Sequence, residues 1–262
     1  MMKKFWQSVK ANCGVLIVLS FLTTFLFKDF IFMGKLPIPS DTIVGAYFPW
    51  RDEIWMGREA GFPIKNFTIR DVVRQLYPWR LLAINQIKEG QVPLWNPYNF
   101  TGVPHLANVF TAAFYPFNLL FFLFSFPFAW SLYVAIQPIL TGLAFYLFLK
   151  NLKLSKISAT LGSIVFAFFS FLMIRLEFGM VGHTALWLPL ALLAINKLAE
   201  KKSFRWWLAG TLFLFFSLLA GYLQVTIYSF AVFCLYAFYR SLLRKDFKRA
   251  ANYFFCSGFF WQ

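Results

Sequence analysis

Residues 206–239, WWLAGTLFLFFSLLAGYLQVTIYSFAVFCLYAFY, form a stretch of 34 residues without a charged side chain. A single helix of that length would extend about 51 Å, whereas the hydrocarbon core of a bilayer is about 30 Å thick. We therefore expect two short helices with a turn near Gly221. Basic residues flank the stretch on both sides, so a hairpin places both of its ends in the cytoplasm.

Other charge-free runs extend this pattern through the chain. Of the 262 residues, 60% are apolar and only 13% are charged, which excludes a disordered or an ordinary soluble protein. The first run is followed by Phe27-Lys28-Asp29, without the small residues of a signal peptidase site, so we expect an uncleaved helix. The expected spans are residues 11–27, 128–149, 157–174, 178–196, 206–220 and 222–239, with a partial span at 250–262.

The segment before residue 128 needs a separate interpretation. Residues 106–149 are too long for one crossing, but two crossings would place Lys150, Lys153 and Lys156 outside. We therefore expect an external loop over 28–111 and an interfacial helix over about 112–126, a segment that contains Pro116. The predicted fold is an all-α polytopic membrane protein.

The distribution of charge explains the formal net charge of +15. Fifteen of the 25 basic residues fall in the expected cytoplasmic segments and nine in the long first loop, leaving Arg175 in a short external loop. Long loops escape the positive-inside rule, so the nine basic residues in the first loop do not count against this orientation. The positive net charge therefore indicates the orientation of the chain in the membrane rather than nucleic-acid binding. The 13 apolar residues at 250–262 are too few to cross a bilayer, and we expect the chain to be the N-terminal part of a longer protein.

Chemistry is expected on the outer face. Seven of the ten acidic residues lie in the first external loop, Glu177 lies in the second, and both histidines are external. None of the expected span interiors holds Asp, Glu, Lys or Arg, although ion-coupled transporters usually keep such groups at mid-membrane. The three cysteines have no CxxC spacing, which favours packing over a metal or disulfide role.

The first loop carries a short repeated pattern. Asp41 stands six residues before Tyr47 in YFPWR, and Asp71 stands six before Tyr77 in YPWR. The spacing of apolar residues over 71–86 predicts an amphipathic helix on the membrane surface. Residues 90–105 are rich in turn formers and aromatics, which indicates an ordered loop rather than a linker.

The first loop and the segment after it contain PSD at 39–41, YFPW at 47–50, YPWR at 77–80, PLWNPY at 93–98, GVP at 102–104 and FYPFN at 114–118. This series of motifs resembles the first external loop of YfhO-like bacterial membrane proteins, and the similarity continues through Gly182-His183 and WLPL at 187–190. The resemblance implies a GT-C-like transmembrane helix bundle with a long, partly helical first external loop. It also implies a glycosyltransferase that moves a sugar from a polyprenyl-phosphate carrier to a cell-envelope glycopolymer or glycolipid on the outer face of the bacterial plasma membrane.

Under this resemblance, Asp41 matches the acidic residue that follows the first transmembrane helix of GT-C enzymes, with Asp71 as the second candidate. Either carboxylate would take a proton from the acceptor hydroxyl. A plainer alternative exists for each residue. Asp41 would cap a helix after Pro39-Ser40, and Asp71 would stabilise the N–H groups at a helix start.

Four basic side chains are candidates for binding the lipid phosphate, because guanidinium groups match phosphate oxygens and a charged histidine donates: Arg74, Arg80, Arg175 and His183. Their plain alternative is snorkelling at a helix end. Trp79 and Trp95 would stack on sugar rings, or anchor the loop at the membrane interface. A divalent metal held by Asp41 with Glu177 or His183 is a further alternative, without a supporting spacing motif.

Two other classes of function remain open. A polytopic transporter or lipid flippase would have similar helices, and a non-catalytic scaffold for envelope assembly would use the loop only for docking. No GxGxxG, P-loop, HExxH or GxSxG pattern is present, so a nucleotide-sugar donor, zinc chemistry and serine hydrolysis lack support.

Overall fold

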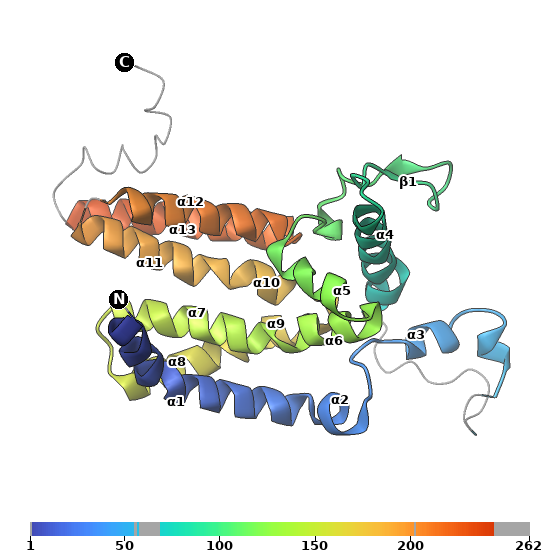
Figure 1. The fold of residues 1–262 in the computed structure, drawn as a ribbon, viewed down its shortest axis with the longest axis horizontal. Coiled ribbons are helices and arrows are strands. Elements are labelled where there is room, and N and C mark those ends of the chain that lie inside the picture. The colour runs from blue at the N-terminus through green and yellow to red at the C-terminus, as the bar shows by residue number, and fades with distance from the viewer. Residues whose placement is uncertain (1, 55–56, 58–68, 202, 244–262) are drawn as a thin grey trace, which may run out of the picture. The chain divides into compact units, whose positions relative to one another are not determined.

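The computed structural model describes residues 2–54, 57, 69–201 and 203–243. These residues are mostly helical, and their one sheet is a two-stranded antiparallel ladder of β1 (Trp95–Asn96) and β2 (Val103–Pro104) (Figure 1). The partial span expected at 250–262 lies outside the described residues. The predicted all-α class is confirmed at this level.

Four helical segments are long and apolar enough to cross a membrane: Phe126–Asn151, Lys156–Ile174, Val181–Glu200 and Leu223–Leu243. Two shorter apolar helices, Cys13–Leu26 and Phe204–Leu219, complete the set found among the described residues. These six segments lie where the sequence places its spans. The lengths and compositions of the four longer segments indicate a membrane-associated protein.

The chain divides into two compact units. The first, here the helix unit, comprises Met1–Leu19, Pro138–Phe168 and Gly182–Gln262. The second, here the loop unit, comprises Ser20–Gln137 and Phe169–Val181. Helix α1 (Met2–Leu26) contributes to both units.

Helix α7 (Gln137–Asn151) supplies the centre of the helix unit. On one side it packs against α1 and α8 (Lys156–Ala167), through a core formed by Val15, Leu19, Tyr146, Ala159 and Ala167. A second core joins α7 to α11 (Trp187–Glu200) and α13 (Leu223–Leu243), and its members are Phe148, Leu192, Ile195 and Ala237. Packing of small alanines against large side chains lets these helices approach closely, as membrane helices do.

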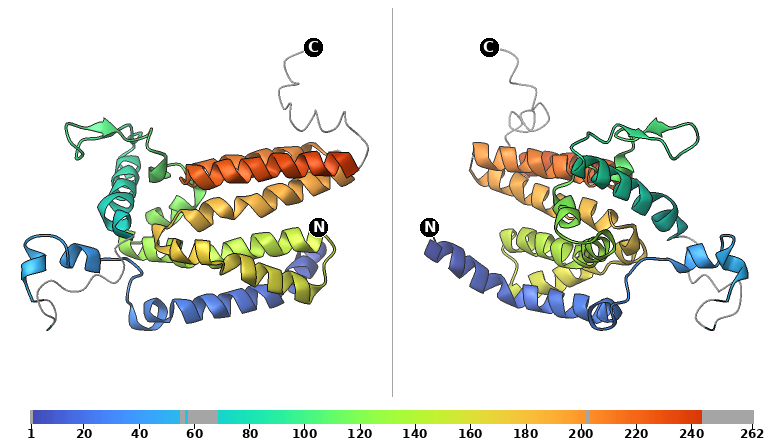
Figure 2. Two further views of the ribbon diagram at one scale, coloured as in Figure 1. Left: turned by 180° about the vertical axis from the view of Figure 1, so that it is seen from behind. Right: turned by 45° about the vertical axis from the view of Figure 1, so that its right-hand side comes forward.

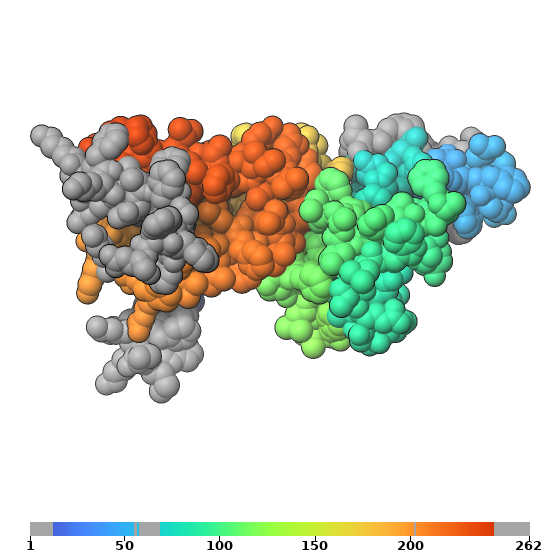
Figure 3. All heavy atoms as spheres, turned by 90° about the horizontal axis from the view of Figure 1, so that it is seen from above, coloured from blue at the N-terminus to red at the C-terminus, as the bar shows by residue number. Residues whose placement is uncertain are grey.

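The predicted hairpin is present. Helix α12 (Phe204–Leu219) ends just before Gly221, whose φ of +95° suits only glycine, and α13 begins at Leu223. Both views in Figure 2 show α11, α12 and α13 running alongside one another in orange and red. In Figure 3 the atoms of α12 and α13 form a continuous surface, and many of the exposed side chains are large and apolar, including Phe215, Ile227 and Leu235. A bilayer would cover such a surface.

Prolines divide two of the long segments. Helix α6 (Phe126–Ala135) passes into α7 at Pro138, which has no N–H to donate to the Val134 carbonyl. The buried Gln137 side chain donates to that carbonyl oxygen instead (3.1 Å) and also to the Leu176 carbonyl (2.9 Å). Pro189 likewise follows the break between α10 (Val181–Ala185) and α11.

The loop unit consists of short elements around α4 (Tyr77–Lys88) and α6. The remaining helical elements are α2 (Lys28–Met33), α3 (Asp41–Val44), η1 (Trp50–Asp52), η3 (Val72–Leu76), η4 (Val109–Thr111), η5 (Pro116–Leu119), α5 (Leu120–Leu123), α9 (Ser170–Ile174) and η6 (Leu176–Phe178). The helix expected over 71–86 is therefore present as η3, a π-helix, followed by α4.

The helix expected over 112–126 is shorter than predicted. Ala112 adopts a left-handed φ of +47°, and the Asn118 side chain closes a turn by donating to the Ala112 carbonyl oxygen (2.6 Å) and the Ala113 carbonyl oxygen (3.1 Å). Helical structure therefore starts only at Pro116 and breaks after Leu123. A new helix begins at Phe126, with Pro127 in its first turn, where a missing N–H costs nothing.

The β1–β2 ribbon explains the turn-rich segment 90–105. Gly102, with φ +104°, follows the tip of the ribbon, and the indole ring of Trp95 occupies the space where a Cβ would lie. Only glycine therefore fits this position. On the neighbouring strand the Asn96 side chain accepts a hydrogen bond from the Tyr98 N–H (2.9 Å), which holds the start of the turn.

Candidate functional site

A cavity of about 570 Å³ lies within the loop unit and is lined by Asp41. Its walls come from the end of α1, from α2, from the segment 35–41 and from η6. This volume falls in the usual range for small-ligand sites. The cavity is thus lined both by the segment that follows the first apolar helix and by the short loop that contains Glu177.

Four ionisable side chains line this cavity, and they are Asp29, Lys35, Asp41 and Glu177. The Lys35 Nζ lies 3.9 Å from a carboxylate oxygen of Asp29, and both side chains are more than half exposed, so the pair contributes little to stability. Most other lining residues are apolar, among them Phe30, Ile38 and Met173. The lining of the cavity therefore combines three carboxylates and one ammonium group with mostly apolar side chains.

Backbone hydrogen bonds fix the segment that carries Lys35 and Asp41. Helix α2 ends at Gly34, which takes the left-handed conformation, and the Lys35 N–H donates to the Asp29 carbonyl oxygen (3.1 Å). Farther along, the hydroxyl of buried Thr42 donates to the Pro39 carbonyl oxygen (2.7 Å). These bonds hold Asp41 at the first position of α3.

A second cavity of about 590 Å³ shares a wall with the first. Lys35, Leu36, Ile38 and Ser40 line both spaces. The remaining lining residues of the second cavity are Ile43, Val73, Tyr77 and Pro127, none of which is charged. Burial raises the pKa of Tyr77, so its phenol stays protonated and able to donate. The segment 35–40 therefore separates an acidic cavity from a mainly apolar one.

Arg80 lies inside an aromatic cluster and is only 1% exposed. Its guanidinium carbon lies 4.7 Å from the ring centre of Tyr133 and 5.5 Å from that of Trp130, and its Nε donates to the Thr111 carbonyl oxygen (3.3 Å). Its Nη1 has no hydrogen-bond partner among the described residues. These contacts favour a structural role, in which ring faces stabilise a buried cation.

His105 is also buried, and its side chain bonds to α4, the helix that carries Arg80. Its Nε2 is 3.0 Å from the Trp79 carbonyl oxygen, which can only accept, so Nε2 carries the proton. Burial lowers the pKa of His105, and the hydrogen bond to Trp79 opposes that effect in part. A neutral imidazole therefore ties the ribbon to α4.

The other predicted basic residues lie in different surroundings. Arg74 is exposed, with its guanidinium carbon 5.7 Å from the ring centre of Tyr47. Arg175 is half-buried and lies over the Phe171 ring at 4.5 Å. His183 is fully buried in the helix unit, so it is not part of the loop unit that contains Asp41. Phosphate binding by Arg74, Arg80, Arg175 or His183 stays a prediction.

The remaining predicted residues lie apart from the lining of either cavity. Asp71 is exposed directly before η3, which agrees with a position at a helix start. Trp79 is partly buried in α4, and Trp95 is about half exposed (49%) on β1. Asp41 and Glu177 do line one cavity, but no group of three metal-binding side chains occurs within the described part of the chain.

Two residues of the cavity were missed at the sequence level. In the sequence, Asp29 and Lys35 count only among the charges of the long first loop. The sequence does contain a signal for this site. Gly34, followed by Pro37 and Pro39, predicts a helix end and then a turn, which would bring Lys35 close to Asp29.

Comparison of the chain with protein-family models, with curated proteins and with solved structures finds no match. The resemblance to YfhO-like proteins therefore rests on the sequence motifs.

Proposed function

We propose that this protein is a membrane glycosyltransferase that moves a sugar from a polyprenyl-phosphate carrier to a cell-envelope acceptor. The observation that carries the proposal is that Asp41 lines a cavity whose other walls are mostly apolar. A lipid-linked sugar needs such a mixture, because its isoprenoid chain is apolar and its reacting end is polar. The motifs at 39–41, 47–50, 77–80 and 93–98 support the same function through their resemblance to YfhO-like proteins.

In the proposed reaction, Asp41 is the general base. Its carboxylate accepts the proton of the acceptor hydroxyl while that oxygen forms a bond to the anomeric carbon of the sugar. The bond from the anomeric carbon to the phosphate oxygen breaks, and polyprenyl phosphate leaves with the electron pair. Glu177 lines the same cavity and would bind hydroxyl groups of the acceptor or of the sugar.

Lys35 is the proposed ligand for the departing phosphate. Its ammonium group belongs to the wall between the two cavities, and it is the one basic residue among those that line either of them within the described loop unit. A cation at this position would stabilise the charge that develops on the leaving group. The isoprenoid chain would lie along the apolar second cavity, past Ile43 and Val73.

The proposed orientation places the N-terminus in the cytoplasm and the loop unit outside. It rests on the 15 basic residues in the expected cytoplasmic segments, against Arg175 in the short external loops. On this orientation, both cavities open toward the compartment where envelope polymers are assembled.

The test uses membranes that contain the full-length protein, supplied with polyprenyl-phosphate-linked radiolabelled sugars. We expect Asp41→Asn to reduce the label entering envelope polymer by at least about 100-fold, a typical loss when a general base is removed. Asp52→Asn is the matched control, because Asp52 is an exposed aspartate of the same loop that pairs with Arg51 and lines neither cavity.

Three results would decide against the proposal in different ways. Equal labelling by wild type and Asp41→Asn would remove Asp41 from the reaction. Loss of labelling in both Asp variants would show that the effect is not specific to the cavity. No labelling by wild type, with the protein inserted normally, would favour a transporter, a flippase or an envelope-assembly scaffold.

A further inference from the structure

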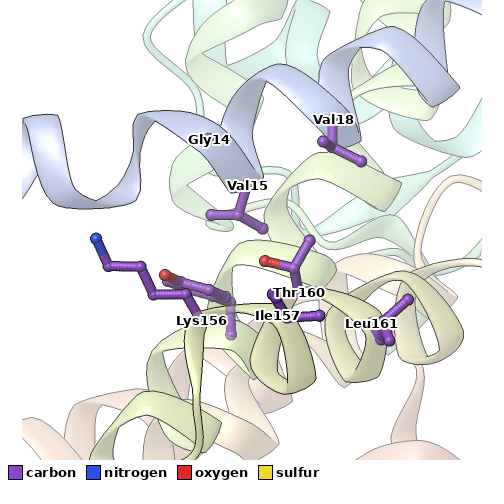
Figure 4. A pocket seen from close by; sticks show the side chains of 8 residues that line it. Gly14, Val15, Val18, Lys156, Ile157, Thr160 and Leu161 are labelled. Atoms are coloured by element: carbon purple, nitrogen blue, oxygen red, sulfur yellow. The ribbon is translucent and has the colours of Figure 1, made fainter.

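A separate groove of about 330 Å³ lies in the helix unit, between α1 and α8. Figure 4 shows Val15 and Val18 projecting from α1 toward α8, with Ile157, Thr160 and Leu161 on the opposite side. The side chains of Ile157 (75% exposed) and Leu161 (60% exposed) form an open rim. The groove contains no acidic residue and belongs to neither cavity of the loop unit.

One end of the groove is basic. Lys156 lines it, and Figure 4 shows its side chain extending along the opening with the amine toward the N-terminal side of Gly14. The ion pairs among the described residues do not include Lys156. Glu200 is the one acidic residue of the described helix unit, and it pairs with Lys197 (2.9 Å). Within the part of the chain that the structure describes, no carboxylate therefore forms an ion pair with the Lys156 ammonium group.

The two helices that form the groove run in the same direction. In Figure 4, both Gly14 to Val18 and Ile157 to Leu161 progress away from the Lys156 amine. Helix N-termini carry partial positive charge, so the first turn of α8, which begins at Lys156, adds to the field of that side chain. Lys153, in the turn before α8, lies at the same end of α8, although its charge also interacts with Glu200. This end of the groove has the charge that suits an anionic group.

We infer that the groove binds an anionic phospholipid of the membrane, with one acyl chain between α1 and α8 and the phosphate at Lys156. The apolar walls match an acyl chain, and the position of Lys156 at the first residue of a membrane-spanning segment places its amine at headgroup depth. Basic pockets between membrane helices bind anionic headgroups in this manner. The inference does not depend on the proposed glycosyl transfer.

Gly14 offers a direct way to fill the groove. A Cβ built at Gly14 meets no other atom within 4 Å, although Gly14 is one of the lining residues. Leucine at this position would therefore add bulk to the groove wall without its Cβ displacing a neighbour. Gly162, also in α8, is different, because a Cβ there would lie 2.5 Å from Leu149.

The experiment is a lipid titration of the purified full-length protein in detergent, with bound lipids counted by native mass spectrometry. We expect wild type to bind phosphatidylglycerol about fivefold more tightly than phosphatidylcholine, the factor that one lysine near an anionic headgroup contributes. Lys156→Gln should remove this preference. Lys201→Gln, which changes an exposed lysine that does not line the groove, should retain it.

Gly14→Leu tests the acyl-chain half of the inference and should reduce binding of both lipids. Inorganic phosphate at millimolar concentration should not displace phosphatidylglycerol. Equal binding of the two lipids by wild type, an unchanged preference in Lys156→Gln, full binding by Gly14→Leu, or displacement by phosphate alone would each overturn the proposal.

Discussion

Arg80 shows how one side chain can join the elements of the loop unit. It starts from α4, contacts two rings of α6 and donates to the carbonyl oxygen of Thr111 in η4. A charge this deeply buried would be costly without such contacts. Its burial also bears on its predicted role, since a phosphate ligand would have to enter the aromatic cluster to reach it.

Replacing Arg80 should therefore affect stability. We expect Arg80→Ala to lower the free energy of unfolding by about 2–4 kcal/mol, because it leaves a void among aromatic rings and removes the bond to Thr111. Arg74→Ala, at an exposed position of the neighbouring η3, should change stability by less than about 0.5 kcal/mol. Thermal unfolding of the detergent-solubilised protein would measure both variants, and equal shifts would refute the structural role of Arg80.

His105 should make stability depend on pH. Burial lowers its pKa in the folded state, whereas the unfolded chain has a value of about 6.5. Between the two values the unfolded state binds more protons, so stability falls as pH decreases below about 6.5 and is fully present above it. We expect His105→Gln to flatten this part of the curve of melting temperature against pH. An unchanged slope between pH 7.5 and 5.5 would show that His105 is not responsible.

At the scale of elements, Gln137 holds the junction of α6, α7 and η6. Its side-chain amide donates to the carbonyl oxygens of Val134 and Leu176, and Pro138 cannot supply the helical hydrogen bond to the first of these. We expect Gln137→Leu to destabilise the protein by about 1–3 kcal/mol, since it removes two buried hydrogen bonds and places an apolar side chain beside the Val134 and Leu176 carbonyl oxygens. Gln224→Leu, at an exposed site in α13, is the matched control. Similar melting temperatures for the two variants would contradict this role.

The sequence predicts the helices better than it predicts their interruptions. The length of a charge-free run and the basic residues at its ends can be read directly from the sequence. The hairpin around Gly221 could therefore be located without knowledge of the fold. The left-handed Ala112 could not, because alanine has no preference for that conformation and the turn depends on the Asn118 side chain. The break before Phe126 is close to the boundary expected from the sequence, where Pro127 stands between the helix predicted over 112–126 and the span predicted from residue 128.

The candidate site was predicted in part. The resemblance to GT-C enzymes points to Asp41 as the acidic residue after the first apolar run, and Asp41 does line a cavity together with Glu177. Lys35 was not selected, because only the turn at Gly34 brings it onto the wall that the two cavities share. Arg80 has the positive charge that a phosphate-binding residue needs, which is why the sequence selects it. Sequence patterns contain no measure of how deeply its side chain is buried.

At the scale of the whole molecule, the proposed orientation can be tested by labelling. In a chain whose native cysteines are replaced by serine, Asn99→Cys at the tip of the ribbon should react with a membrane-impermeant maleimide added to intact cells. Lys153→Cys, in the turn before α8, should react only after the membrane is permeabilised. The reverse pattern would invert the orientation and place both cavities in the cytoplasm.

The central claim is that the cavity lined by Asp41 holds the lipid-linked sugar, and photo-crosslinking tests it most directly. A polyprenyl-phosphate sugar with a photoreactive group near the phosphate would be irradiated with membranes containing the full-length protein, and the labelled peptides identified by mass spectrometry. We expect label in the segment 35–41 or in η6, at a level that falls when Lys35 is changed to Gln but not when Lys88, in α4, is changed to Gln. Label confined to the helix unit, or labelling of the segment 35–41 that is unaffected by Lys35→Gln, would contradict it.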